Sequence, residues 1–189
     1  MSDSELSSLP FNEKYFQDSS SNYHEIRNSA LDDPKMFWAN IAKELSWFRE
    51  WDEVLDWKPP FAKWFTGGKI NASFNCLDRY MNSELKTKLA YIWEGENGEQ
   101  KNITYQDLYN AVCRFANVLK DQGIRKGDRV VFYMSMVPEL LTGVLACARL
   151  GAVHSVVFAG FSAQALAGRI KDCEAKMVIT CDESYRGAK

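Results

Sequence analysis

The clearest candidate for ligand binding is the run GAVHSVVFAGFS, residues 151–162. Its β-branched part, Val153–Phe158, predicts a strand, Ala159 and Gly160 predict a turn, and Ser162 is a residue type that caps helices. Small side chains at such a turn would let a ligand lie against the backbone, and the first N–H groups of the helix would favour an anion. The run is not GxGxxG, and the sequence contains no GxxxxGK[ST]. A purely structural tight turn therefore explains the spacing as well.

Two basic residues follow the next predicted strand, Met177–Thr180. Within CDESYRGAK, Arg186 offers a rigid guanidinium fork for a phosphate and Lys189 a point charge. Both would face the Gly160 turn if the two strands are neighbours in the sheet. The alternative is a pair of solvated bases. Bases outnumber acids only after residue 60, so an anion fits this part of the chain best, while a net charge of -2 argues against a nucleic-acid partner.

The sequence offers no catalytic or metal-binding constellation. Of the histidines, His24 lies in a polar region and His154 in an apolar strand, where we expect it to be a hydrogen-bonded core side chain. The 5 cysteines are far apart and form no CxxC pair, which favours free thiols in a reducing compartment over disulfides or zinc. The polar start MSDSELSSLP and the lack of an apolar run of about 18 residues predict a cytoplasmic protein without a membrane partner.

The elements that must position the turn form an alternating pattern. A buried strand is expected at residues 129–134, a helix from Pro138 to Gly151 with Leu141, Val144, Leu145 and Ala148 inward, then the strand before Ala159 and a helix at residues 162–173. With the strand at 177–180 this predicts an α/β fold, a parallel sheet with flanking helices and right-handed crossovers. Ligands of such sheets bind beyond the carboxyl ends of the strands.

Ahead of the sheet the sequence predicts a hairpin and a capped helix. Strands at 89–93 and 100–103 flank Asn97-Gly98, a strong hairpin turn signal. Thr104 with Asp107 three residues later forms a capping box at the start of a helix, whose inner face is lined by Tyr105, Leu108, Val112, Phe115, Ala116 and Leu119.

Residues 1–67 form a separate region, a polar tail followed by an aromatic-rich helical arm. Asp32-Asp33-Pro34 predicts a helix start, and the apolar spacing from Phe37 to Leu45 predicts one buried face. We interpret the arm as packed on a larger body, with an aromatic ligand cage as the alternative. Lys58-Pro59-Pro60 is interpreted as a stiff linker that closes the arm.

Four long phrases carry a family resemblance: WFTGGKINASFNCLDRY, ITYQDLYNAVCRFANVLKDQGIRKGDRV, ACARLGAVHSVVFAGFSAQALAGRI and CDESYRG. Together they resemble the amino-terminal part of the AMP-forming acetyl-coenzyme A synthetases, a family within the adenylate-forming superfamily. The resemblance extends from about Asp33 to Lys189. It implies a truncated amino-terminal part of the α/β adenylate-forming domain over residues 68–189.

The resemblance also implies an activity and its ligands. Acetate and ATP would form acetyl-adenylate with Mg²⁺, and coenzyme A would then accept the acetyl group. Phe158, Ala159 and Gly160 would lie along coenzyme A, and Arg186 and Lys189 would meet its nucleotide end. The family usually has glycine at Ala159, often arginine at Lys189 and commonly histidine at Tyr80.

The phosphate loop, acetate pocket and catalytic lysine of this family are expected beyond Lys189. The chain would then be an inactive fragment whose partners are acetate, ATP, coenzyme A and the remainder of the enzyme. A stand-alone coenzyme A binding or interaction module, or part of a propionate-preferring ligase, stays open as an alternative.

Overall fold

The computed structural model describes residues 23–183 and divides the chain into two compact units. The first contains the described residues 23–45 and 50–68, and the second contains 46–49 and 69–183. The domain boundary that the sequence predicts between residues 67 and 68 remains a prediction. Arg186 and Lys189 lie outside the described residues.

The second unit is built on a parallel sheet of β7 (Arg129–Met134), β8 (Val153–Phe158) and β9 (Met177–Thr180). The strand order is β8-β7-β9, so the parallel α/β prediction is confirmed. The expectation that β9 lies beside β8 is wrong. β7 is the most deeply buried strand and is the central one, since the first crossover leads to one side of β7 and the second leads back to its other side.

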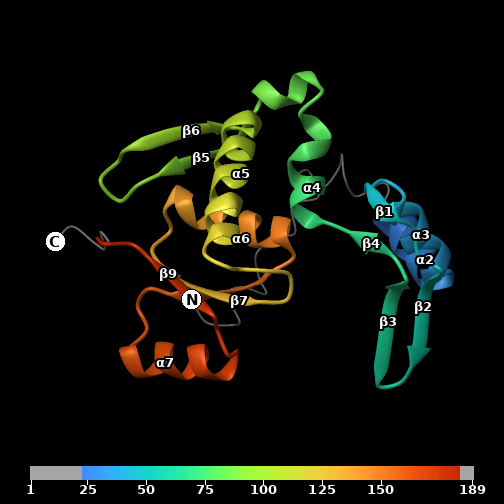
Figure 1. The fold of residues 1–189 in the computed structure, drawn as a ribbon. Coiled ribbons are helices and arrows are strands. Elements are labelled where there is room, and N and C mark those ends of the chain that lie inside the picture. Colours follow the sequence, from blue (N-terminus) through green and yellow to red (C-terminus); the bar gives the residue numbers. More distant parts are fainter. Residues whose placement is uncertain (1–22, 184–189) are drawn as a thin grey trace, which may run out of the picture. The chain divides into compact units, whose positions relative to one another are not determined.

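Helices cover the two faces of this sheet. α6 (Pro138–Leu150) connects β7 to β8 and packs against α5 (Tyr105–Asp121), whereas α7 (Ala163–Asp172) connects β8 to β9 on the opposite face (Figure 1). Two right-handed crossovers that run in opposite directions along a sheet must place their helices on opposite faces. The capping signals act as expected: Gly151 ends α6 with a φ of 72°, and at the start of α7 the Ser162 hydroxyl accepts a hydrogen bond from the Ala165 N–H at 3.3 Å.

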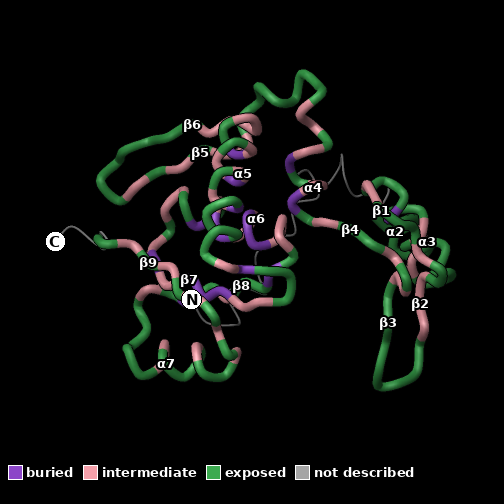
Figure 2. The backbone as a smooth tube through the Cα atoms, in the orientation of Figure 1, coloured by how far each residue is buried: buried purple, intermediate pink, exposed green. Residues whose placement is uncertain are grey.

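The core lies between the sheet and the α5/α6 pair (Figure 2). α5 presents the predicted face, with Leu108, Val112, Ala116 and Leu119 buried. α6 is rotated from the prediction: its buried residues are Leu140, Gly143, Ala146 and Cys147, and Leu141 is 39% exposed. The reason is that α6 packs on α5 and on β7 together, which places the buried stripe between the two contacts.

β8 is an edge strand, and the side chains on its face toward α6 are largely exposed to solvent. Val156 and Phe158 on that side are 50% and 60% exposed. His154, which precedes them at the same alternation, is also exposed. The expectation of a buried His154 is therefore wrong, because apolar neighbours along a strand do not show whether a helix covers them.

Gly143 marks the close approach of α6 to β7 and supplies a test of this packing. A Cβ built there would lie 2.3 Å from Phe132 Cε1, and Phe132 is fully buried. We expect Gly143→Ala to lower the free energy of unfolding by about 1 to 3 kcal/mol through overpacking. In Gly168→Ala on α7 the added methyl would meet nothing within 4 Å, so that variant should gain up to about 1 kcal/mol from helix propensity. Denaturant unfolding of both variants measures the difference, and equal effects would contradict the packing described.

The cysteines supply a second test. Cys147 is buried in α6, and burial raises the pKa of its thiol to about 11, while Cys76 is exposed. Because the thiolate is the reactive form, iodoacetamide at pH 8 should modify Cys76 in the native protein and reach Cys147 only after unfolding. Peptide mass mapping against time follows both sites. Equal rates in the native protein would show that α6 is not packed as described.

The hairpin and its capped helix are confirmed. β5 (Leu89–Glu94) pairs with β6 (Gln100–Thr104) around a turn in which Gly98 has a φ of 79°. Thr104 and Asp107 make both bonds of the capping box, and this bonding lowers the pKa of Asp107.

The elements that precede the β5/β6 hairpin make tertiary contacts that the sequence does not predict. β1 (Trp47–Arg49) pairs with β4 (Lys69–Ile70), which leads to α4 (Ala72–Cys76) and the short 3₁₀ turns η2 (Asp78–Tyr80) and η3 (Glu84–Thr87). Asn71 caps α4 by accepting from the Phe74 N–H at 3.0 Å, and its amide donates to the Ala148 and Arg149 carbonyls at the end of α6. One side chain thus satisfies groups at the ends of two helices.

The first unit consists of α2 (Tyr23–Asp32), α3 (Pro34–Ala42) and a hairpin of β2 (Glu53–Lys58) and β3 (Phe61–Thr66). Asp33 caps α3 as predicted, but only Ala42 is buried in that helix. Lys58-Pro59-Pro60 belongs to the turn of this hairpin, in which Lys58 pairs with Phe61, so the linker prediction is wrong. Some of its aromatic side chains pack against one another, with Trp38 and Trp64 6.2 Å apart between ring centroids. Within the described residues no helix has the length and apolar character needed to cross a membrane.

Candidate functional site

The candidate site lies at the carboxyl ends of β7 and β8, where the chain leaves the sheet in opposite directions. The loop after β7 leads to α6 on one face, and the turn after β8 leads to α7 on the other. Adjacent parallel strands whose connections diverge in this way leave a crevice between their carboxyl ends. The GAVHSVVFAGFS run is therefore located where a sheet of this type binds ligands.

The turn after β8 is tightly constrained. The Phe161 N–H donates to the Phe158 carbonyl at 3.0 Å, and the rings of these residues meet edge to face with centroids 6.1 Å apart. The Arg169 guanidinium lies 4.4 Å from the centroid of the Phe161 ring. The Tyr133 hydroxyl lies 3.0 Å from the Ala159 carbonyl oxygen and 2.9 Å from the Phe161 carbonyl oxygen.

A pocket of about 370 Å³ opens beside this turn. Its lining is mainly apolar, with one carboxylate and one hydroxyl: Glu96, Met134, Ser135, Met136, Leu140, Val156, Val157, Phe158, Ala159 and Gly160. The volume and lining suit a narrow, largely apolar chain with few polar groups.

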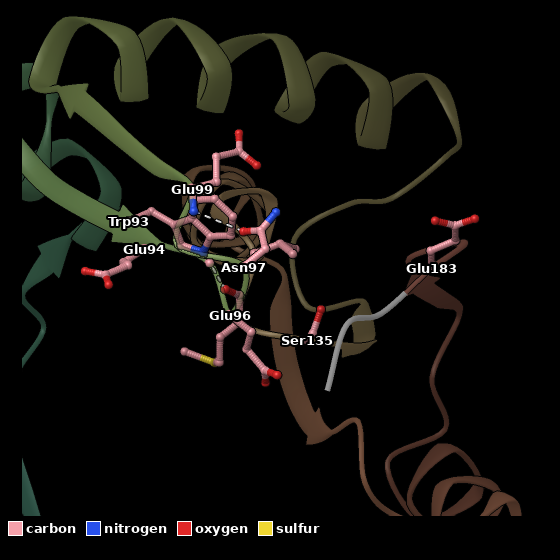
Figure 3. Close-up of a pocket in the computed structure, with 10 residues that line it drawn as sticks. Trp93, Glu94, Glu96, Asn97, Glu99, Ser135 and Glu183 are labelled. Atoms are coloured by element: carbon pink, nitrogen blue, oxygen red, sulfur yellow. Dashed lines mark hydrogen bonds between the residues drawn. The ribbon is translucent and has the colours of Figure 1, made fainter. Parts of the chain in front are cut away.

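A second hollow, of about 310 Å³, shares Glu96, Ser135 and Met136 with this pocket. Glu94, Glu96 and Glu99 from the hairpin line it together with Ser135 and Glu183 (Figure 3). The Trp93 indole N–H donates to the Met136 carbonyl at 2.7 Å and ties the hairpin to the loop after β7. In the described part of the chain, the residues that line these two hollows include no lysine or arginine.

The structure brings together some of the predicted site residues. Phe158, Ala159 and Gly160 lie together at the pocket, with Phe158 and Gly160 exposed and Ala159 half-buried. Arg186 and Lys189 fall outside the described residues. The strand that precedes them, β9, is separated from β8 by β7, so the two strand ends lie roughly 10 Å apart rather than side by side.

Several site residues have no signal in the sequence. Glu96 directly precedes the predicted turn at Asn97-Gly98, and Ser135 and Met136 directly follow the predicted strand at 129–134; tertiary contacts bring both segments to the crevice. Tyr133 lies within that predicted strand, where nothing in the sequence distinguishes it. The described residues contain no group of three or more His, Cys, Asp or Glu side chains that could hold a metal ion.

Comparison with known sequences identifies two matching families. Residues 80–189 match the sequence model of the family described as AMP-binding enzyme, and residues 23–76 match that of the acetyl-coenzyme A synthetase N-terminus. These matches meet near the start of η2.

Curated relatives of high similarity carry one description. The chain is 53% identical over 170 residues to an acetyl-coenzyme A synthetase of Leptospira biflexa, a match that covers 88% of this chain and 26% of the relative. It is 56% identical over 165 residues to that of Rubrobacter xylanophilus, covering 87% and 26%, and 52% identical over 167 residues to that of Mycolicibacterium smegmatis, covering 87% and 18%. The chain thus spans about a quarter or less of the length of these relatives.

Proposed function

Because the chain belongs to the family of AMP-binding enzymes, we propose that it forms the amino-terminal part of an AMP-forming acetate–CoA ligase. The observation that carries the proposal is the continuous match, at 53% identity over 170 residues, to the amino-terminal quarter of a protein described as acetyl-coenzyme A synthetase. The location of the turn after β8 supports it independently, since ligands of parallel sheets bind at such strand ends.

The proposed reaction has two steps. An acetate oxygen attacks the α-phosphorus of ATP, giving acetyl-adenylate and pyrophosphate. The thiolate of coenzyme A then attacks the acetyl carbonyl carbon, and the C–O bond to AMP breaks with AMP as the leaving group. The products are acetyl-CoA, AMP and pyrophosphate.

The part of this reaction that we assign to the chain is the reception of coenzyme A. The pantetheine arm of coenzyme A is narrow and only weakly polar, which matches the pocket beside Phe158, Ala159 and Gly160. Arg186 and Lys189, which follow β9, are our proposed phosphate partners, by the family resemblance.

We assign adenylate formation, with ATP and Mg²⁺, to the remainder of the proposed enzyme, because the family resemblance implies that the phosphate loop and the catalytic lysine lie there. Among residues 23–183 no group of three or more His, Cys, Asp or Glu side chains could hold a metal ion. A cytoplasmic location and a preference for acetate over propionate belong to the same proposal.

The test begins with the coding region after Lys189. An in-frame phosphate loop supports a ligase, whereas a stop codon supports a stand-alone binding module. The full-length polypeptide should then release AMP only when acetate, ATP and coenzyme A are all present. Release of AMP at the same rate without coenzyme A would contradict the role given to this chain. Faster turnover of propionate than of acetate would show that propionate is the preferred substrate.

The isolated 189-residue chain should be inactive in the first step. We expect no acetate-dependent exchange of pyrophosphate into ATP, because the phosphate loop and catalytic lysine that the family resemblance implies are expected beyond Lys189. Its affinity for coenzyme A should be weak, on the order of millimolar or about 4 kcal/mol, because phosphate contacts at an open surface are screened by water and salt. Radiolabelled exchange and isothermal titration measure the two quantities, and exchange above background would contradict the assignment.

A further inference from the structure

Tyr133 has a position that the proposed reaction does not yet use. It lies near the carboxyl end of β7, the strand between β8 and β9, where it pairs with Val157 on one side and Thr180 on the other. Its hydroxyl is within hydrogen-bonding distance of the Ala159 and Phe161 carbonyl oxygens, at 3.0 and 2.9 Å. A phenol has one proton to donate, so that proton is shared between two carbonyl oxygens of the same turn.

Tyr133 contacts the turn from the side opposite the pocket. Alternate residues of a strand point to opposite faces, and its neighbour Met134 lines the pocket on the α6 face. Tyr133 is not among the residues that line the hollows beside the turn. It can therefore hold the turn without touching a ligand that lies in the pocket.

Tyr133 also joins the two strand ends that are not neighbours. Its backbone carbonyl accepts a hydrogen bond from the Thr180 hydroxyl at 2.7 Å, at the last residue of β9. Tyr133 thus contacts the last residue of β9 through its backbone carbonyl and the turn after β8 through its hydroxyl.

We propose that Tyr133 is a positioning residue for coenzyme A: its hydroxyl holds the backbone of residues 158–161 in the conformation that receives the coenzyme. The inference rests on the proposed function. Its physical basis is that a ligand lying against backbone atoms depends on the exact course of that backbone, which needs support from behind. The internal hydrogen bond between Phe161 and Phe158 closes the turn but does not anchor it to the sheet.

The experiment uses Tyr133→Phe in the full-length enzyme. The variant keeps the ring and removes only the hydroxyl. We expect KM for coenzyme A to rise roughly threefold to tenfold, the ratio that corresponds to one lost hydrogen bond. The rate at saturating coenzyme A should stay within about twofold, because the hydroxyl does not touch the reacting atoms. Tyr105→Phe is the matched control, since Tyr105 starts α5 and contacts Tyr80 rather than the turn.

A second variant tests the coenzyme A contact at the turn separately from the role of Tyr133. Gly160→Leu, which fills the turn itself, should raise KM for coenzyme A strongly. If it does not, the proposed coenzyme contact is wrong. If Gly160→Leu raises KM and folded Tyr133→Phe behaves like Tyr105→Phe, only the role of Tyr133 is overturned. Failure of Tyr133→Phe to fold, or a lower melting temperature with unchanged KM, would also overturn it, because the hydroxyl would then maintain the fold rather than the turn.

Discussion

Arg149→Ala is expected to lower the free energy of unfolding by about 2 to 3 kcal/mol, the largest stability effect that we predict for an exchange of a charged side chain. Arg149 binds Asp78 through two parallel contacts, Nη1 to Oδ2 at 2.8 Å and Nη2 to Oδ1 at 2.6 Å. The side chains are only 24% and 17% exposed. Removing the arginine leaves a largely buried carboxylate without its partner, and the expected cost is somewhat below that of a fully buried pair.

The surroundings of the pair strengthen this expectation. The Arg149 guanidinium also lies 5.3 Å from the centroid of the Tyr109 ring, and the hydrogen bond to Asp78 raises the pKa of Arg149. The pair connects the end of α6 with η2, while Asn71 bonds the same end of α6 from α4. Loss of Arg149 should therefore loosen the contact between the segment at 71–80 and the helical layer.

Denaturant unfolding measures the effect, and Arg114→Ala is the matched control because Arg114 is exposed on the neighbouring helix α5. We expect the control to stay within about 0.5 kcal/mol of the wild type. A double variant, Asp78→Leu with Arg149→Met, should lose less than the two single changes added together, since it leaves no charge unpaired. If Arg149→Ala behaved like Arg114→Ala, the pair would contribute no more than a surface ion pair.

Gly160→Leu is expected to raise KM for coenzyme A tenfold to a hundredfold in the full-length enzyme, or about 1.4 to 2.8 kcal/mol. Gly160 is exposed at the mouth of the pocket beside the turn, and a leucine would place four additional heavy atoms there. The pantetheine arm could then no longer lie against the backbone. The change should affect the second half-reaction, because acetyl-adenylate forms without coenzyme A.

Steady-state kinetics with varied coenzyme A and pyrophosphate exchange with saturating ATP separate the two half-reactions. Gly168→Leu on α7 is the control, since a Cβ there would meet nothing within 4 Å. It should leave both measurements within about twofold of the wild type. Loss of pyrophosphate exchange in folded Gly160→Leu, with an unchanged KM for coenzyme A, would contradict this assignment. The turn would then act in adenylate formation from acetate and ATP rather than in binding coenzyme A.

Local patterns in the sequence were sufficient for most of the elements. The capping box at Thr104 and Asp107, the turn at Gly98 and the caps at Gly151 and Ser162 are all present as predicted. These signals act within a few residues, because a cap or a turn is decided by the backbone groups next to it. The family resemblance was likewise readable, since it rests on long phrases that do not depend on how the chain packs.

What the sequence could not decide were relations between segments that are distant along the chain. Periodicity shows that α6 has an apolar side. However, α6 packs against both α5 and β7, and in this packing Leu141 is exposed and Gly143 lies against Phe132. Strand order is another such relation: alternation of strands and helices is the same whether β9 lies beside β8 or beside β7. For this reason the sequence could predict a turn at Gly160 but could not place Tyr133 behind it or Glu96 in front of it. The turn was determined by its own residues, whereas the pocket arises from the side chains that the sheet order and the hairpin bring to it.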